Sequence, residues 1–386
     1  MFPSVPTLVL GSILLQIPLS LAGTQEAPSG KTPVAPAKEA SALDDLWSLT
    51  TLYKNNANPF LQEFKLRGRY QGQYHWLDSD QGDSDAWENR RSRLGFDAKL
   101  FRKKIEIRLD AQSNDEFDPF YDRLVDAYIK WKPSNNFALT LGRQKPQIGY
   151  YDWLESTNAQ PTFERSQIFG QLRVDRATGA VAEGKADNFT WQAGVYSNDM
   201  DREFGSLDGG VSFSTGIGYD FKQAVNLEKA DWRLDWLHSE LEAGDTVLNR
   251  YENIFSSTVW LKDGRWSLVG EAFFGTGEAA DAFGFYILPT YDIVPKKLQA
   301  VARYSFSTGD GADSLTVQRR YEREAPGLTG GGRGETYHAA YAGLQYFIHG
   351  DKLKLLAGAE YAHLDGGGNG GDFDGLTVLT GIRFSF

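Results

Sequence analysis

Five arginines are spaced so that they could attract anions. Arg67 and Arg69 alternate with apolar residues in one segment, Arg91 and Arg93 do so in the next, and Arg108 does so in a third. A guanidinium group carries a permanent positive charge and forms charge-assisted hydrogen bonds with carboxylates and phosphates. If the five side chains share one wall of an aqueous channel, they form a basic stripe that draws anions inward.

A two-residue period must position these arginines. In LRGRYQGQYHW, residues 66–76, one face carries Leu, Gly, Tyr and Trp, and the other carries Arg, Gln and His. The same alternation returns near 91–100 and 105–112, which predicts three successive strands of one design. Because alternate side chains of a strand point to opposite faces, all five arginines are expected on the same side of the sheet.

The rest of the chain repeats this pattern, giving 16 candidate strands from residue 64 onward, each with its connection about 20 residues long. We therefore predict an all-β fold, a transmembrane antiparallel β-barrel of about 16 strands with a polar lumen and an apolar outer surface. The further strands are predicted at 124–132, 136–145, 167–183, 187–197, 211–222, 229–242, 250–263, 264–276, 280–293, 297–309, 334–349, 350–365 and 374–386.

Connection lengths favour a membrane barrel over a soluble sandwich, because short and long connections alternate, as they do in outer-membrane barrels. The long connections are expected at about 77–88, 113–123, 146–166, 198–210, 307–333 and 366–373. Aromatic residues at strand ends are expected to form girdles at the membrane interfaces: Trp76, Trp131, Trp260 and Trp266.

Composition excludes several classes of protein. The 386 residues carry a net charge of −11, which disfavours a nucleic-acid binder. After the first two dozen residues no apolar stretch approaches the ~20 residues of a membrane-spanning helix, so a helical transporter is excluded. The chain has no Cys, its five His lie on separate segments, and it has no G-x-S-x-G elbow. We predict no enzymatic activity, no catalytic residues, no cofactor and no metal site.

The first 59 residues differ from the barrel pattern. Residues 1–22 hold an apolar run closed by Ser20-Leu21-Ala22, which predicts a signal peptide. Residues 23–59 are expected to form a linker rich in Pro, Ala and Lys, and its 43–53 segment is either a short amphipathic helix or an unstructured arm. The predicted barrel then covers 60–386.

Three motifs resemble the phosphate-selective porin O and P family. The family's Arg-rich second strand is matched by Glu88-Asn89-Arg90-Arg91-Ser92-Arg93-Leu94-Gly95-Phe96. Its Gly-x-x-Lys-Pro at the end of the fifth strand is matched by Leu141-Gly142-Arg143-Gln144-Lys145-Pro146. Its Glu-Arg-Ser closing the third loop is matched by Glu164-Arg165-Ser166. The resemblance covers about 60–386. It implies a sixteen-stranded barrel, usually trimeric, whose third loop folds into the lumen as a constriction. By the strand count, 146–166 is that loop, so Lys145 and Arg165 are expected near the narrowest point.

The predicted function is passive diffusion of small hydrophilic solutes across the outer membrane of a Gram-negative-type bacterium. Residues 380–386, which end in Phe386, resemble the assembly signal of such barrels. We expect a preference for anions, with phosphate selectivity as a finer hypothesis. The expected partners are outer-membrane lipid, lipopolysaccharide, small anionic solutes and further copies of the chain in a homotrimer. The predicted channel-lining residues are Arg67, Arg69, Arg91, Arg93, Arg108, Lys145 and Arg165.

Alternatives remain open at this point. The arginines could pair with lumen carboxylates such as Asp97, Glu106 and Asp110, leaving a braced wall with little net potential. The channel could be a non-selective porin, or a sugar or polysaccharide channel in which Tyr128 and Tyr196 stack on the solute. The outer loops also carry nine carboxylates that should repel anions or bind divalent cations that bridge lipopolysaccharide: Asp78, Asp80, Asp83, Asp85, Glu88, Asp115, Glu116, Asp118 and Asp122.

Overall fold

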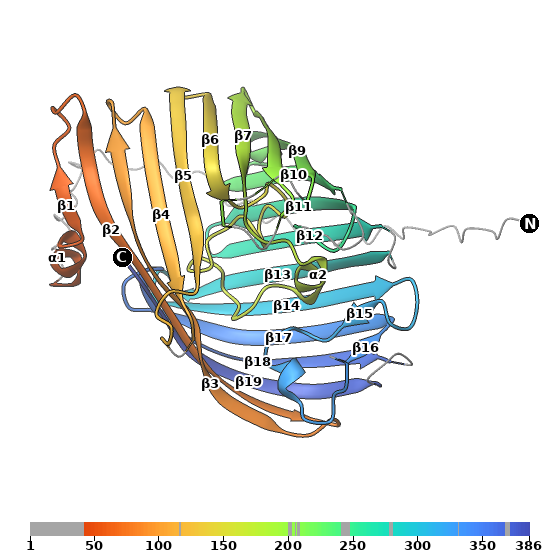
Figure 1. Cartoon of the computed structure of the whole chain (residues 1–386). Helices are drawn as coiled ribbons and strands as arrows, with labels where there is room; N and C mark the ends of the chain where they lie inside the picture. The colour runs from red at the N-terminus through yellow and green to blue at the C-terminus, as the bar shows by residue number, and fades with distance from the viewer. Residues whose placement is uncertain are drawn as a thin grey trace, which may run out of the picture. The chain divides into compact units, whose positions relative to one another are not determined.

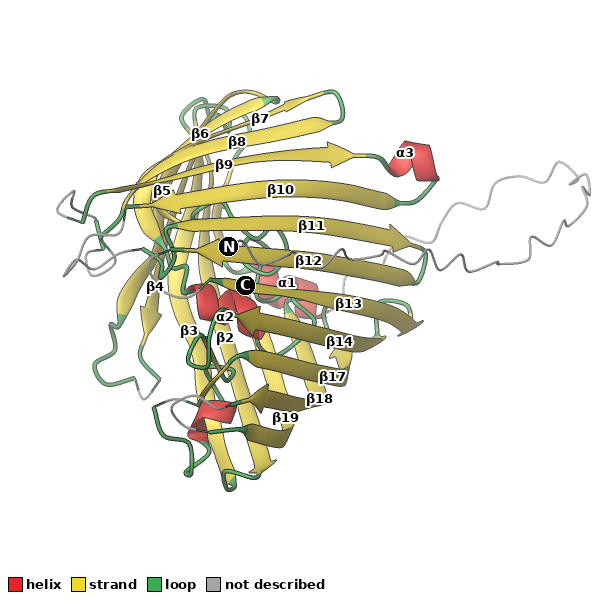
Figure 2. Cartoon of the chain, turned by 90° about the vertical axis from the view of Figure 1, so that its right-hand side faces the viewer, coloured by secondary structure: helices red, strands yellow, loops and turns green. Residues whose placement is uncertain are grey.

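The computed structural model describes residues 42–386 apart from 116, 200–202, 205, 207–208, 241–247, 278–280, 331 and 367–370. The predicted signal peptide and residues 23–41 of the predicted linker lie outside this part of the chain. Within it, sixteen strands form a closed antiparallel barrel (Figures 1 and 2). In order they are β2 (Leu61–Ser79), β3 (Ser84–Leu100), β4 (Ile105–Ser113), β5 (Arg123–Ser134), β6 (Phe137–Gln144), β7 (Ala177–Ala186), β8 (Phe189–Ser197), β9 (Val211–Asp220), β10 (Lys229–Ser239), β11 (Asn253–Asp263), β12 (Trp266–Thr276), β13 (Ala282–Val294), β14 (Leu298–Gly309), β17 (Thr336–Phe347), β18 (Leu353–Asp365) and β19 (Phe373–Ser385).

The barrel closes where β19 pairs with β2, in register from Gly375 opposite Ser79 to Ser385 opposite Arg69. Each remaining pair of neighbouring ring strands is consecutive among the sixteen. All ladder hydrogen bonds are therefore made within the sheet, and the ring has no open edge. The predicted fold class and strand number are confirmed. Among the described residues, no helix is long and apolar enough to cross a membrane.

The strand predicted at 167–183 is wrong over its first half. Gln167–Leu172 forms helix α2, and strand β7 begins only at Ala177. Ser166 starts the helix because its hydroxyl accepts a hydrogen bond from the Phe169 amide. The apolar residues of this segment are buried on several sides, so the alternation that a two-sided strand requires is absent.

The two rims of the barrel differ. One rim has short connections, at 101–104, 135–136, 187–188, 221–228 with helix α3 (Lys222–Val225), 264–265, 295–297 and 348–352. The other rim, here called the long-loop rim, has connections at 80–83, 114–122, 145–176, 198–210, 240–252, 277–281, 310–335 and 366–372. In outer-membrane barrels the long loops face the outside. The expected long connection at 77–88 is mostly strand, because β2 and β3 continue to pair with each other as a hairpin up to Leu77 and Ser84, beyond the point where β3 pairs with β4.

The outward faces of the strands are apolar, and the inward faces of the first strands are polar. Leu94 of β3 is 55% exposed, whereas Arg91 on the opposite face is 5% exposed. Trp76, Trp131 and Trp266 are exposed on the outer surface, as expected for girdles. The prediction for Trp260 is wrong, since its ring packs inside against Tyr151 with a centroid distance of 4.9 Å.

The predicted polar lumen is present only on part of the barrel wall. Apolar residues of the 145–176 connection, including Ile148, Phe163 and Ile168, pack in one buried cluster with inward residues of β10–β14 and β17–β19, among them Phe273 and Leu356. Helix α2 lies within the barrel against β12, β13 and β14 (Figure 1). The inward apolar residues of these strands therefore pack against a buried loop, so this part of the lumen is a packed core.

A short arm completes the seam of the barrel. Helix α1 (Ala42–Ser48) leads into β1 (Thr51–Lys54), which pairs with β2 at Glu63–Lys65, the stretch beyond the end of β19. Trp47 of α1 is 5% exposed, donates its indole N–H to the Ser385 carbonyl at 2.6 Å and packs on the His349 ring. Of the two alternatives for 43–53, the structure has the helix up to Ser48, whereas residues 51–53 belong to strand β1.

Replacing Trp47→Ala should release this arm without opening the barrel. Loss of a buried Trp costs about 3 kcal/mol, so we expect deuterium exchange of the β1 amides to accelerate by about a hundredfold. The matched control is Trp87→Ala, because Trp87 is 56% exposed on β3. Equal exchange of β1 in the two variants would show that Trp47 does not hold the arm.

Candidate functional site

The connection 145–176, here called the lumen loop, is fixed inside the barrel by polar wall residues. Glu271 of β12 accepts hydrogen bonds from the Tyr151 and Asp152 amides at 3.1 and 2.8 Å. Arg383 of β19 donates four hydrogen bonds of 2.6–2.9 Å to loop carbonyls, those of Thr157, Gln160, Thr162 and Phe163. Non-regular backbone inside a barrel needs such partners, because each buried unpaired amide or carbonyl is costly.

Arg90 is a further clamp, and the sequence analysis did not include it among the lumen residues. Its guanidinium forms a two-point ion pair with Glu164 of the lumen loop, at 2.5 and 2.9 Å. Strict alternation places Arg90 outside, opposite in direction to Arg91. The register shifts here, since Gln71 faces Arg91 while Gly72 faces Asn89, and this β-bulge turns both arginines inward. Although burial opposes it, Arg90 holds the pKa of Glu164 well below its usual range.

Two of the predicted channel-lining arginines are neutralised. Arg67 pairs with Asp97 at 2.8 Å and with Asp110 at 3.2 Å, and Arg108 pairs with Asp97 at 2.8 Å. This arrangement corresponds to the braced-wall alternative at these two positions. Glu106, the third carboxylate of that alternative, pairs instead with Lys132.

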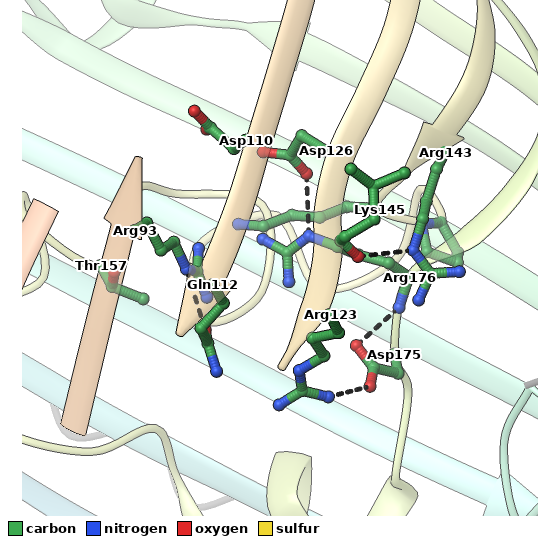
Figure 3. Close-up of polar contacts among 12 residues, drawn as sticks. Arg93, Asp110, Gln112, Arg123, Asp126, Arg143, Lys145, Thr157, Asp175 and Arg176 are labelled. Atoms are coloured by element: carbon green, nitrogen blue, oxygen red, sulfur yellow. Dashed lines mark hydrogen bonds and ion pairs between the residues drawn. The ribbon is translucent and has the colours of Figure 1, made fainter. Parts of the chain in front are cut away.

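Three other predicted arginines have neutral partners. Arg69 donates to the Thr157 hydroxyl at 2.8 Å, Arg91 to the side-chain oxygen of Gln71 at 2.8 Å, and Arg93 to that of Gln112 at 3.0 Å. Figure 3 shows Arg93 directed at Gln112. Within the described chain none of the three forms an ion pair with a carboxylate. Hydroxyl and amide partners orient a guanidinium but leave its full charge available.

Lys145 and Arg165 are also held without carboxylates. Lys145 donates to the carbonyls of Leu154 and Glu155, both at 3.3 Å, and Arg165 donates to the Asp152 carbonyl at 2.6 Å. Both cations lie over the Trp153 ring, at 5.0 and 4.9 Å from its centre. Burial lowers the pKa of Lys145, and repulsion from nearby cations lowers it further. Burial lowers the pKa of Arg165 to about 10.

Three adjoining cavities follow these cations through the barrel. The central cavity, about 490 Å³, is lined by eleven arginines and Lys145 but by only two carboxylates, Glu164 and Asp175. The central cavity shares Arg69 and Arg93 with a second cavity of about 230 Å³. Lys65 and Lys352 also line this second cavity, which lies toward the rim with the short connections. Toward the long-loop rim the central cavity adjoins a cavity of about 390 Å³, whose described lining includes no carboxylate. Arg67 lines the second cavity, and Arg108 lines none of the three.

Seven of the eleven arginines that line the central cavity were not among the predicted channel-lining residues. Arg123 pairs with Asp175, and Arg176 pairs with Asp126 of β5, as Figure 3 shows. The others missed are Arg90, Arg173, Arg319, Arg320 and Arg323. The cluster at 319–323 was visible as a basic run in the sequence, but its loop carries no periodicity that could have placed it in the lumen.

The long loop 310–335 reaches this cavity because it is docked on the wall. It contains β15 (Leu315–Thr316), the 3-10 turn Glu322–Glu324 and β16 (Arg333–Gly334). Glu322 is buried and accepts hydrogen bonds from the Tyr337 hydroxyl and the Gln318 amide, both at 2.7 Å. Burial, together with repulsion from Glu360, raises the pKa of Glu322 to about 8.

The carboxylates expected at the channel mouth belong to the β2–β3 hairpin and to the β4–β5 connection of the long-loop rim. Asp78, Asp80, Asp83 and Asp85 are exposed on the projecting β2–β3 hairpin, and Glu88 pairs with Arg320. Glu116 lies outside the described residues. None of the remaining eight lines any of the three cavities. Glu88 and Asp122 pair with Arg320 and Arg123 of the central lining, whereas the other six described carboxylates are exposed on the rim.

Comparison with known proteins agrees with this architecture. The model of the family described as phosphate-selective porin O and P matches residues 64–218, which is consistent with the resemblance noted in the sequence. No curated protein sequence matches the chain. The solved structures with similar folds include OmpF of Salmonella typhi in complex with daunomycin, with a TM-score of 0.61 and 14% identity, covering 87% of this chain and 100% of that one.

Two further structures are an anion-selective porin from Comamonas acidovorans and OmpT of Vibrio cholerae. The first has a TM-score of 0.58 and 12% identity, covering 84% of this chain and 99% of that one. The second has a TM-score of 0.56 and 13% identity, covering 86% and 100%. At these identities the likeness establishes the fold. Together with the family match, it places this chain in the outer membrane of a Gram-negative bacterium as a porin-type channel.

Replacing Arg383→Met should loosen the lumen loop, because four buried carbonyls lose their donor. We expect the loop to open about 3 kcal/mol more easily, and single-channel recordings to show larger open-state current fluctuations. The control is Thr377→Val on the same inner face of β19, since the Thr377 hydroxyl makes no hydrogen bond with the described part of the loop. Unchanged current noise in Arg383→Met would contradict the clamp.

Docking of the 310–335 loop should depend on pH. Since the pKa of Glu322 is raised in the docked state, docking holds a proton that the released loop gives up. Docking should therefore weaken as pH rises from about 4.5 to about 8 and change little above that value. Deuterium exchange of residues 315–324, corrected for the intrinsic pH dependence, measures this, and Glu322→Gln should abolish the trend. A trend of opposite sign, or one retained in Glu322→Gln, would rule out Glu322 as its source.

Proposed function

We propose that this chain is a passive diffusion channel of the outer membrane that prefers small anions. The observation that carries the proposal is the central cavity, which twelve basic side chains and only two carboxylates line. Arg90, Arg123, Arg176 and Arg320 are in ion pairs, and the other eight cations form none within the described part of the chain. Both carboxylates are themselves paired with arginines. The cavity therefore keeps a large uncompensated positive charge.

The position of this positive charge inside the barrel strengthens its attraction for anions. The barrel wall and the buried lumen loop are low-dielectric surroundings, which focus the field along the water-filled path. The cavities that share Arg69 and Arg93 below, and Arg173, Arg319 and Arg323 above, extend the basic lining in both directions. An anion that moves from one guanidinium to the next exchanges hydrogen bonds and never leaves the positive region.

Phosphate selectivity is the finer part of the proposal. It is supported by the family description that matches residues 64–218 and by the fork geometry of the guanidinium group, which suits phosphate oxygens. Lys145 adds an ammonium point charge at the start of the lumen loop. We assign the constriction to this loop and to the arginine wall that it faces on β2–β5.

The expected environment and assembly follow from the same fold. The apolar outer faces of the strands would contact lipid and lipopolysaccharide, and the exposed acidic hairpin 78–85 could bind bridging divalent cations. A homotrimer is expected, and one solved structure of similar fold, from Vibrio cholerae, is described as a trimer form. Passage through such a channel requires no catalytic residue, cofactor or nucleic acid.

Reversal potentials in a KCl gradient test the anion preference. We expect anion selectivity in planar bilayers, reduced about tenfold in the permeability ratio by Arg69→Gln with Arg93→Gln, because two uncompensated charges are lost. The control is Arg108→Gln with Asp97→Asn, which removes one cation and one carboxylate without changing the net charge and leaves Arg67 paired with Asp110. A cation-selective current would overturn the proposal. A selective current that added phosphate does not reduce would leave the anion channel but exclude phosphate as a preferred solute.

A further inference from the structure

The cavity nearest the long-loop rim, here called the outer cavity, has a composition unlike the rest of the pathway. Five arginines line its volume of about 390 Å³, and no carboxylate does so in the described part of the chain. The arginines come from three long connections: Arg173 follows α2, Arg250 lies in 240–252, and Arg319, Arg323 and Arg333 lie in 310–335. Five guanidinium groups around one cavity repel one another unless a counter-charge is bound among them.

Local details indicate that these cations are prepared for a ligand. The Nε atom of Arg323 is buried and has no hydrogen-bond partner among the described residues. Burial and repulsion from Arg173, Arg323, Arg320 and Arg250 lower the pKa of Arg319 to about 10. Arg173 has φ 55°, in the left-handed region that favours glycine, and it lines both the outer and the central cavities.

The size and lining of the outer cavity narrow the class of ligand. Its volume lies within the ~300–1,000 Å³ typical of pockets for small organic molecules, well above what one inorganic ion fills. All its cations are arginines, whose forks bind carboxylates at two points. Leu328 adds an apolar contact for a carbon skeleton. The cavity lies beside α2 inside the barrel, so the phosphates of membrane lipid do not reach it.

We propose that the outer cavity is a capture site for small organic anions that carry two or three carboxylates. This inference rests on the proposed anion channel and adds the substrate class. A polycarboxylate neutralises several of the five guanidinium groups at once, whereas a monocarboxylate neutralises one. Because the outer cavity shares Arg173, Arg319 and Arg323 with the central cavity, a captured anion can pass inward by exchanging one carboxylate contact at a time.

Block of KCl current by added anions tests the proposal with the whole chain in planar bilayers. Propane-1,2,3-tricarboxylate added on the long-loop side should block at a concentration about a hundredfold below propionate, at roughly tenfold for each added carboxylate contact. Arg250→Gln with Arg333→Gln should raise the half-blocking concentration by at least about tenfold, since both residues line only the outer cavity of the three. The charge-preserving pair Arg250→Lys with Arg333→Lys should retain most of the block.

A second variant guards against a folding defect. Arg173→Gly removes a charge from the outer cavity while relieving the positive φ, so it should weaken the block without lowering stability. Equal block by propionate and tricarboxylate, or full block in Arg250→Gln with Arg333→Gln, would overturn the site. Block by pyrophosphate but not by tricarboxylate would overturn its assignment to carboxylates. The reversal potential of the same channels distinguishes these outcomes from a failure of the proposed anion channel. If the anion channel itself were wrong, the current would be cation-selective.

Discussion

The structure depends on satisfying the backbone of a non-regular loop inside a membrane barrel. The lumen loop passes through the interior with few backbone hydrogen bonds of its own, so its amides and carbonyls need partners on the wall. Glu271 accepts from two amides and Arg383 donates to four carbonyls, and both are inward residues of regular strands. The wall thus supplies polar groups from regular strands, whose geometry holds them rigidly.

The choice of partner then decides what charge remains for the pathway. Where arginines meet carboxylates, as at Arg67 with Asp97 and Arg90 with Glu164, the ion pair fastens the wall or the loop and cancels most of its field. Where they meet an amide, a hydroxyl, a carbonyl or an indole face, the cation is oriented and its field persists. Both kinds of contact occur around the central cavity, so the ion pair of Arg90 with Glu164 can clamp the loop while Arg69, Arg91 and Arg93 keep their charge beside it.

Periodicity was enough to predict the barrel, its strand number and the inward direction of Arg69, Arg91 and Arg93, because these depend only on alternation along single strands. It failed where the backbone departs from that alternation. The bulge at Arg90 depends on pairing between two strands, and α2 depends on the Ser166 cap and on surroundings that bury it on several sides. The apolar cluster in the lumen was missed because inward apolar residues look the same whether they face a packed loop or the opposite wall.

The loop arginines show a different limit. Arg319 and Arg323 are about 150 residues from Arg173 in sequence, and only the docking of loop 310–335 against the wall brings them to α2. That docking depends on Glu322, a carboxyl held among Tyr337, Gln318 and the second carboxyl Glu360. Because a protonated Glu322 favours docking, the same proton that fixes the loop also assembles the arginines of the outer cavity. An anion bound by those arginines would in turn favour the docked loop, so proton and anion binding are thermodynamically linked through one segment of chain.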